Sequence, residues 1–181
     1  MVNRYIGVMA VDEEWGVGKN NDLPWNKNKE GLRSFKEITQ NCIIVMGRKT
    51  WVSIGSKKLP NRINVVISSQ HIEGPDLVLG GDLRDIFKKI HQKYPERGDS
   101  EICVIGGAGL IKEMHDLDML AMIYLTTIEG TYGADTFFDK TIIEDMNCYW
   151  TETLRTDYPK TVLRIYAKGN DKKMRTTNYG M

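Results

Sequence analysis

The residues best suited to chemistry lie in one stretch near the start of the chain, residues 16–35. A loop rich in glycine and asparagine leads into Leu-Pro-Trp at 23–25, and an amphipathic run with Glu30 at its start follows. Glycine and asparagine allow backbone angles that other residues resist. A carboxylate at the mouth of an apolar cleft can hold a cationic or amide-like heterocycle by charge-assisted hydrogen bonds. Taken alone, Glu30 fits better as an ordinary acidic residue in the first turn of a helix, where acidic residues are common.

Three other places in the sequence have the pattern of a phosphate site at the end of a strand. Residues 47–49 are a glycine and two basic residues after an apolar run, where the free N–H groups of a helix start would attract an anion. Residues 106–109, Gly-Gly-Ala-Gly, follow another apolar run and open a helix, which lets the backbone approach a pyrophosphate. Two serines, at 68 and 69, end a third apolar run. Each pattern alone also fits a solvated surface, a turn or tight packing of a strand on a helix.

The composition indicates one soluble globular domain. The chain has 181 residues, of which 41% are hydrophobic and 27% charged, and its 25 basic and 24 acidic residues give a net charge of +1. This balance argues against a nucleic-acid partner. The sequence shows no apolar run of membrane-spanning length and no signal peptide, so we expect a cytoplasmic protein without a membrane partner. The cysteines and histidines show no disulfide pattern and no metal-ligand spacing, which predicts reduced thiols and no bound metal.

Apolar runs alternate with helical patterns along most of the chain. In the helix expected after residue 25, Leu32, Phe35 and Ile38 recur at helical spacing and define an inward face. The other predicted elements are strands at 5–11, 42–46, 63–67, 77–79, 102–105 and 119–128, a short helix at 48–51, a helix at 82–94, and two final strands near 149–155 and 161–167. This order predicts an α/β three-layer sandwich with a mostly parallel sheet and a C-terminal antiparallel hairpin. We expect a domain at 1–168 and a polar, basic tail at 169–181.

Taken in order, the motifs resemble the dihydrofolate reductase family from about residue 5 to residue 167. The resemblance rests on the following segments: Ala10-Val11-Asp12, Gly16-Val17-Gly18-Lys19-Asn20, Leu23-Pro24-Trp25, Phe35-Lys36, Val45-Met46-Gly47-Arg48-Lys49-Thr50-Trp51, Ser53-Ile54-Gly55, Leu59-Pro60-Asn61-Arg62, Ile67-Ser68-Ser69-Gln70, Ile105-Gly106-Gly107-Ala108 and Tyr124-Leu125-Thr126. It implies one α/β domain with an eight-stranded sheet, and reduction of 7,8-dihydrofolate to tetrahydrofolate by hydride transfer from NADPH. It also implies a monomer that supports one-carbon metabolism and thymidylate and purine synthesis, with antifolates such as methotrexate or trimethoprim as ligands.

The same resemblance assigns roles to individual residues. The loop at 16–23 would close over the nicotinamide, Arg62 would hold the carboxylate of the folate tail, and the Gly106–Gly107 peptide would be cis. The catalytic residues implied are Glu30, which orients the pterin, with Leu23, Trp25 and Thr126. The substrate-binding residues implied are Val8, Met9, Glu30, Phe35, Ile54, Leu59, Arg62, Ile105 and Thr126. The NADPH-binding residues implied are Met9, Ala10, Gly16, Val17, Gly18, Gly47, Arg48, Lys49, Thr50, Ser68, Ser69, Ile105, Gly106, Gly107, Ala108, Gly109, Leu110 and Ile111.

The chain departs from the family pattern at the acid itself. The family's acid stands four residues before the phenylalanine that corresponds to Phe35, and here that position is Gly31. Counted from Trp25, the acid stands five or six residues on, which gives Glu30 or Gly31. Either Glu30 is the acid, through a local irregularity that offsets a rotation of about 100° per helical residue, or the site has lost its acid. In addition, Ile111 stands where many members carry an aromatic hydroxyl near the nicotinamide.

Two other functions remain open beside an active reductase. One is the related pyrimidine reductase of riboflavin synthesis, although Arg62 after Leu-Pro and the Leu-Pro-Trp segment favour folate. The other is a protein that binds folate and NADPH with little turnover, which Gly31 at the position of the acid would explain. Turnover of dihydrofolate distinguishes both from the leading prediction.

Overall fold

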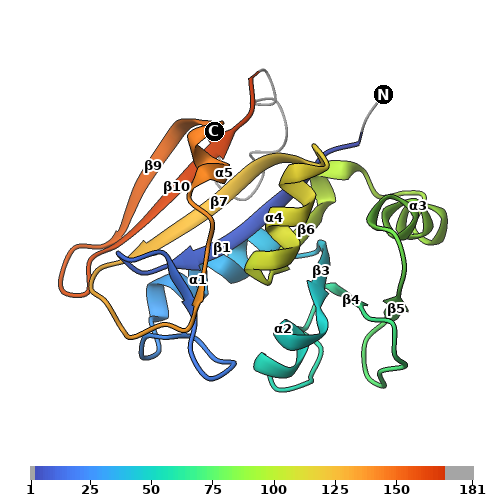
Figure 1. Cartoon of the computed structure of the whole chain (residues 1–181), viewed down its shortest axis with the longest axis horizontal. Helices are drawn as coiled ribbons and strands as arrows, with labels where there is room; N and C mark the ends of the chain where they lie inside the picture. The colour runs from blue at the N-terminus through green and yellow to red at the C-terminus, as the bar shows by residue number, and fades with distance from the viewer. Residues whose placement is uncertain (1–2, 170–181) are drawn as a thin grey trace.

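An eight-stranded sheet forms the centre of the computed structural model, which describes residues 3–169 (Figure 1). The sheet has the strand order β5-β4-β3-β6-β1-β7-β10-β9. Its strands are β1 (Tyr5–Val11), β3 (Ile43–Gly47), β4 (Ile63–Ile67), β5 (Leu77–Leu79), β6 (Ile102–Gly106), β7 (Leu120–Ile128), β9 (Asn147–Arg155) and β10 (Thr161–Ala167). Neighbours pair in parallel except β10, which is antiparallel to β7 and to β9. The predicted mostly parallel sheet with a C-terminal hairpin is thereby confirmed.

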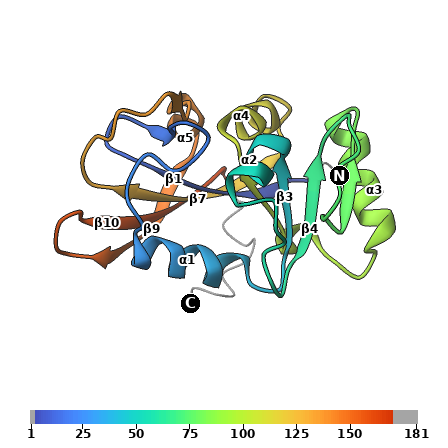
Figure 2. The same ribbon diagram turned by 90° about the horizontal axis from the view of Figure 1, so that it is seen from below.

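Helices cover both faces of this sheet, which gives the predicted three layers. They are α1 (Lys29–Thr39), α2 (Arg48–Ser53), α3 (Leu83–Lys93), the 3-10 turn η1 (Asp99–Glu101), α4 (Ala108–Asp116) and α5 (Thr141–Glu144). Figure 2 shows α1 on the opposite side of the sheet from α4. In residues 3–169, no helix has both the length and the apolar character that a membrane crossing requires. The domain boundary near residue 168 and the tail stay predictions, since residues 170–181 lie outside the described residues.

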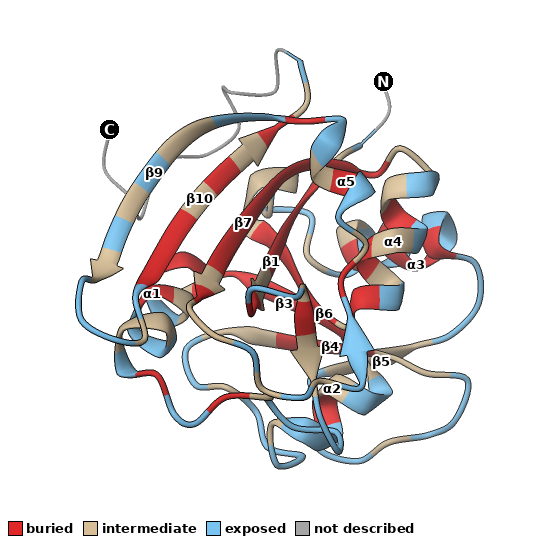
Figure 3. Ribbon diagram, turned by 60° about the vertical axis from the view of Figure 1, so that its left-hand side comes forward, coloured by how far each residue is buried: buried red, intermediate tan, exposed pale blue. Residues whose placement is uncertain are grey.

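Buried residues concentrate in the central strands, whereas β9 at the edge is partly exposed along its length (Figure 3). Near-continuous apolar runs are typical of strands covered on both faces. The α3–α4 cluster on one face includes Val45, Val104, Ile86, Phe87, Ile111 and Met114. The α1–α2 cluster on the other face includes Ile6, Val8, Ile38, Ile44, Met46, Trp51, Ile105 and Leu163. The two clusters hold the helices against the two faces of the sheet.

Caps and periodicity explain where the two long helices begin. The Asp82 carboxylate accepts hydrogen bonds from the N–H groups of Arg84 and Asp85, which caps α3 as expected for an N-terminal Asp. In α1, the predicted inward face was wrong in one residue, because Leu32 is 41% exposed. The buried face of α1 contains Ser34 and Ile38. Leu32 is two residues before Ser34, which corresponds to a rotation of about 200° around the helix, so its side chain points away from that face.

A further sheet of two strands was not predicted. β2 (Gly16–Gly18) pairs antiparallel with β8 (Thr136–Phe137), so the glycine-rich loop is joined to a segment more than a hundred residues later in the chain. Strands of two and three residues carry too little periodic pattern to be recognised in a sequence. Their pairing gives the start of the predicted lid a fixed attachment.

Truncating Ile44 to alanine is expected to lower the free energy of unfolding by about 2–5 kcal/mol. Ile44 is fully buried in β3 and is flanked by strands on both sides, so neighbouring side chains cannot easily fill the cavity. Urea unfolding measures the loss. Val52→Ala, at a side chain that is 49% exposed in α2, serves as control and should change stability by less than about 0.5 kcal/mol. Equal stability of both variants would contradict this description of the core.

Candidate active site

The carboxyl ends of β3, β4 and β6 meet at one edge of the sheet. The parallel registers pair Gly47 with Ile67 and Met46 with Gly106. Ser68 follows β4 directly, and α2 and α4 begin just beyond β3 and β6. Ligands of open α/β sheets bind outside the carboxyl ends of the strands. The structure therefore brings together the three segments that the sequence predicted to bind phosphate groups.

Gly106 is the most constrained residue of this edge. Its peptide bond with Gly107 is cis, as the resemblance predicted. Its φ of +134° is one that residues with a Cβ rarely adopt. A Cβ at this position would lie 3.3 Å from Thr50 Oγ1 and 3.6 Å from Met9 Sδ. The backbone of β6 and the side chain of Thr50 thus approach each other in a way that only glycine allows.

The same edge fits a phosphorylated cofactor. Arg48 and Lys49 are exposed in the first turn of α2. The residues that precede α2 and α4, Gly47 and Gly107, make no side-chain cap, so the N–H groups of both helix starts can bind an anion. A Cβ on Gly47 would meet nothing within 4 Å, so there is space beside these groups. Within residues 3–169, no group of three or more His, Cys, Asp or Glu side chains could hold a metal ion.

Five predicted substrate-binding residues gather at the α1–α2 cluster. Val8 and Ile105 are buried members of this cluster, and Phe35, Ile54 and Leu59 pack against it from α1 and from the segment after α2. A flat, largely apolar ring can bind among such side chains. The structure thus gathers these five residues at one hydrophobic cluster, and their contacts with substrate stay predictions.

The other predicted site residues of β1 and β7 divide between the two faces of the sheet. Thr126, 7% exposed in β7, pairs with Ala10 of β1. Met9 points to the opposite face of the sheet, where it packs on the α3–α4 cluster. Three further residues with predicted cofactor roles, Val17, Leu110 and Ile111, belong to or pack on that same cluster.

Arg62 is held in place by its neighbours. Its Nε donates to the carbonyl oxygen of Pro60 at 3.0 Å, and its Nη1 donates to Thr39 Oγ1 at 2.9 Å. Burial lowers the pKa of this guanidinium, which nevertheless stays charged because arginine does not deprotonate in proteins. A guanidinium with a fixed plane is suited to bidentate binding of a carboxylate.

The loop predicted as a lid is anchored by two aspartates that the sequence reasoning missed. Asp12, 2% exposed, accepts hydrogen bonds through Oδ1 from the N–H groups of Glu14 and Gly16 at 2.9 and 2.8 Å. Asp135 accepts from Asn20 N–H at 2.8 Å, and this hydrogen bond lowers the pKa of Asp135. An aspartate directly after an apolar run is a signal for such a turn, because its side chain bonds the backbone two residues on.

The two apolar residues at the end of this loop differ in burial. Leu23 is 45% exposed, whereas Trp25 is 7% exposed and its ring meets Tyr132 edge-on, with ring centroids 6.3 Å apart. The tryptophan therefore fixes the end of the loop, and Leu23 remains at the surface.

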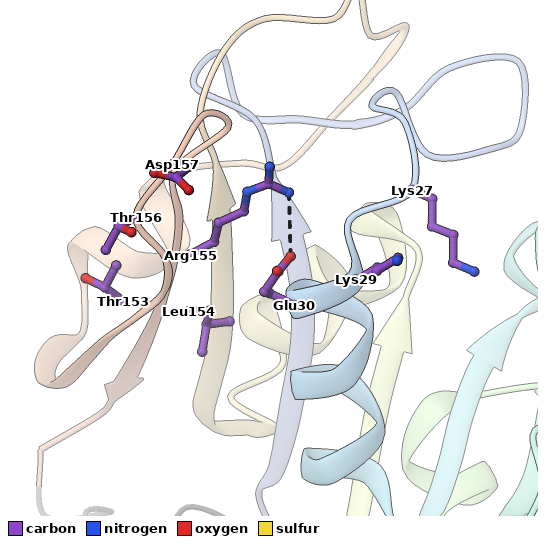
Figure 4. A pocket seen from close by; sticks show the side chains of 8 residues that line it. All are labelled: Lys27, Lys29, Glu30, Thr153, Leu154, Arg155, Thr156 and Asp157. Atoms are coloured by element: carbon purple, nitrogen blue, oxygen red, sulfur yellow. Dashed lines mark ion pairs between the residues drawn. The ribbon is translucent and has the colours of Figure 1, made fainter.

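Glu30 reaches toward β9. Its Oε2 lies 3.7 Å from Nη1 of Arg155 (Figure 4). Nη2 of the same arginine donates to the carbonyl oxygen of Tyr158 at 3.0 Å. Both residues line a cavity of about 600 Å³, and the others that line it are Lys27, Lys29, Thr153, Leu154, Thr156 and Asp157. None of the predicted substrate-binding residues other than Glu30 lines this cavity.

The geometry of the first turn of α1 explains why Glu30 points toward β9. The Leu32 N–H donates to Asn28 O at 3.0 Å, which is the regular helical bond, so this turn lacks the irregularity that would rotate Glu30. Residues four apart share a helix face, so Gly31, not Glu30, lies on the side of Phe35. Glu30 as the pterin-orienting acid stays a prediction, and this placement favours the alternative in which the acid position has been lost.

Comparison with known proteins gives consistent matches. The profile of the dihydrofolate reductase family matches residues 5–166. The chain is 32% identical over 148 residues to the dihydrofolate reductase of Rattus norvegicus, covering 76% of this chain and 79% of the relative. It is 35% identical over 141 residues to that of Staphylococcus aureus, with the same coverage of 76% and 79%. A bifunctional dihydrofolate reductase-thymidylate synthase of Paramecium tetraurelia is 33% identical over 83% of this chain, which spans only 31% of that longer protein.

A solved structure supports the fold. The chain superimposes on a dihydrofolate reductase from Enterococcus faecalis, solved in complex with NADP(H) and RAB-propyl, with a TM-score of 0.77 and 26% identity. The match covers 92% of this chain and 97% of that protein.

Proposed function

The chain belongs to the dihydrofolate reductase family, and from this premise we propose that it reduces 7,8-dihydrofolate to 5,6,7,8-tetrahydrofolate. It is an NADPH-dependent oxidoreductase. The observation that carries the proposal is the edge formed by β3, β4 and β6. There, Gly106 with its φ of +134° and the uncapped starts of α2 and α4 suit NADPH, close to the apolar side chains of the α1–α2 cluster.

In this proposal, bound NADPH supplies the hydride, and the protein supplies position, electrostatics and the exclusion of water. The segments 47–50, 68–69 and 106–109 hold the cofactor. Val8, Phe35 and Ile54 pack on the pterin and the benzoyl group, and Arg62 binds the tail carboxylate. The loop that ends at Trp25 closes over the reacting rings, so that the proton arrives from water only when the loop allows it.

The biological setting belongs to the same proposal. Tetrahydrofolate produced by this reaction would support one-carbon metabolism and the synthesis of thymidylate and purines. We propose a cytoplasmic monomer that binds antifolates such as methotrexate or trimethoprim. Light scattering coupled to gel filtration tests the monomer, and competition with dihydrofolate tests the inhibitors.

The reaction is tested by following NADPH oxidation with dihydrofolate as the substrate. We expect steady turnover that depends on both compounds. Binding of both without turnover would support a second function, a folate- and NADPH-binding protein, which the glycine at position 31 favours. Turnover of the ribosylaminopyrimidine of riboflavin synthesis in place of dihydrofolate would contradict the proposal.

The role of Glu30 is decided by Glu30→Gln. From its position beside Arg155, we expect kcat to change by less than about threefold, because an ion pair between partly exposed side chains contributes only about 0–1 kcal/mol. Kinetics with dihydrofolate across pH and titration with NADPH give the measurement. A loss of most activity with NADPH binding retained would instead make Glu30 the acid that orients the pterin.

A further inference from the structure

Tyr132 contacts the end of the lid loop, residues 16–25, from a part of the chain that is distant in sequence. Its ring meets the ring of Trp25 edge-on, with centroids 6.3 Å apart and an interplanar angle of 70°. Aromatic pairs prefer this geometry, because the positive edge of one ring meets the negative face of the other. Trp25 is buried, so its indole has little freedom beside this neighbour. The place of the Tyr132 ring therefore helps to set the place of Trp25.

The hydroxyl of Tyr132 attaches this ring to the end of the central sheet. It donates to the carbonyl oxygen of Glu129. Glu129 in turn donates its N–H to Lys160 O at 2.9 Å and accepts from Lys160 N–H through Oε2 at 2.7 Å, just before β10 begins. A Cβ on Gly130, whose φ is +100°, would lie 3.1 Å from the hydroxyl oxygen of Tyr132 and 2.9 Å from that of Tyr158. The two hydroxyls thus converge over a residue that has to be glycine.

The segment that carries Tyr132, residues 129–137, also holds the start of the lid loop. Glu13, which precedes the loop, donates its N–H to Gly130 O at 3.1 Å, and its Oε2 accepts from Gly130 N–H at 2.7 Å. β2 of the loop pairs with β8 of this segment. The start of the loop is therefore joined to the segment by backbone hydrogen bonds, whereas the end of the loop meets it through the pair of Trp25 and Tyr132.

We propose that Tyr132 is a positioning residue of the reaction, whose ring places Trp25 and thereby sets the geometry in which the lid loop closes over the reacting rings. This inference rests on the proposed function. A closing loop excludes water and completes the arrangement of the reactants, and small displacements of the reactants slow a reaction strongly. Tyr132 acts through Trp25 and has no contact with the substrate in this proposal.

The test compares Tyr132→Leu, which removes the ring, with Tyr132→Phe, which keeps it. Mixing the enzyme–NADPH complex with dihydrofolate in a single turnover measures hydride transfer, and deuterated NADPH shows that this step is the one observed. Tyr132→Leu should slow hydride transfer by about 3- to 10-fold, the range of an aromatic edge contact, and Tyr132→Phe by less than about twofold. Because Tyr132 is partly exposed, neither change should unfold the domain.

Hydrogen exchange provides a second measurement that needs no turnover. In the NADPH complex, the backbone amides of residues 16–25 should exchange faster in Tyr132→Leu than in the wild type or in Tyr132→Phe, because the end of the loop is less well held. Phe137→Leu is the matched control, since it removes a ring that is 51% exposed from the same segment. It should change neither the rate of hydride transfer nor the exchange.

The outcomes separate a positioning residue from a structural one. Where the wild type turns over, the rate decides: Tyr132→Leu with an unchanged rate would overturn the inference, even if urea unfolding shows a loss of stability. Equal slowing in Tyr132→Phe would also overturn it, because the hydroxyl and not the ring would then be responsible. If the wild type binds NADPH without turnover, the exchange decides instead, and the missing turnover counts against the proposed function alone. A wild type that does not bind NADPH would refute both.

Discussion

Substituting Gly106 by alanine should weaken NADPH binding by about 100-fold, which corresponds to roughly 2.7 kcal/mol. The backbone of Gly106 has a φ of +134°, and holding a residue with a Cβ in such a conformation costs about 1–3 kcal/mol. The added methyl group would also lie 3.3 Å from Thr50 Oγ1, so the end of β6 or the start of α2 must move. Both segments belong to the proposed cofactor site. Fluorescence titration with NADPH measures the loss, and urea unfolding shows how much stability is lost with it.

Gly98→Ala is a suitable control for this experiment. Gly98 has a φ of −84°, and the closest atom that a Cβ would meet is Glu101 Oε2 at 4.0 Å. This substitution should leave both NADPH affinity and stability near those of the wild type. If Gly106→Ala is folded and binds NADPH as tightly as the wild type does, the cofactor does not bind at this edge of the sheet. That result would contradict the roles proposed for segments 47–50 and 106–109.

The central sheet could be predicted closely because its strands are buried on both faces. Such strands read as uninterrupted apolar runs, and the run 63–67 coincides with β4 while the run 102–105 is one residue shorter than β6. The β2–β8 pair could not be predicted, because its few residues have no periodic pattern and its pairing depends on a contact distant in sequence. Periodicity records burial on one face or both, and it carries no information on which short loops meet.

The candidate site was less predictable than the fold, and Glu30 shows why. Counting from Trp25 gives Glu30 or Gly31 as the acid, whereas counting from Phe35 gives Gly31, and one residue corresponds to about 100° around the helix. The choice depends on where α1 starts, and the structure places its N-cap at Asn28, whose side chain accepts a hydrogen bond from Gly31 N–H. The signal was present in the sequence, since asparagine just before a helical pattern is a typical N-cap. This signal predicts a helix that starts at residue 29, as α1 does.

Replacing Arg62 by lysine should raise KM for dihydrofolate by about 10- to 100-fold, with kcat changed less than about threefold. Two guanidinium nitrogens are engaged with Pro60 O and Thr39 Oγ1. These two bonds fix the guanidinium plane, and within residues 3–169 the third nitrogen, Nη2, makes no hydrogen bond, so it is available to a ligand. Lysine has one charged nitrogen, and it cannot keep these anchoring bonds while binding a carboxylate. A hydrogen bond to a charged group contributes about 1.5–3 kcal/mol, which sets the expected range.

A dihydropterin without the folate tail, used as substrate, shows whether Arg62→Lys loses a contact with the tail carboxylate or impairs the whole substrate site. If Arg62 binds the tail carboxylate, wild type and Arg62→Lys should reduce this shorter substrate with the same kcat/KM, because neither can use the contact. Arg33→Lys, at an exposed residue of α1, should leave KM unchanged for both substrates. An equal rise of KM for the shorter and the full substrate would mean that Arg62 supports the pocket through Thr39. An unchanged KM for dihydrofolate would place the tail carboxylate elsewhere. Since the predicted loss appears in KM and the loss in Gly106→Ala appears in NADPH affinity, the two variants test the two halves of the proposed site independently.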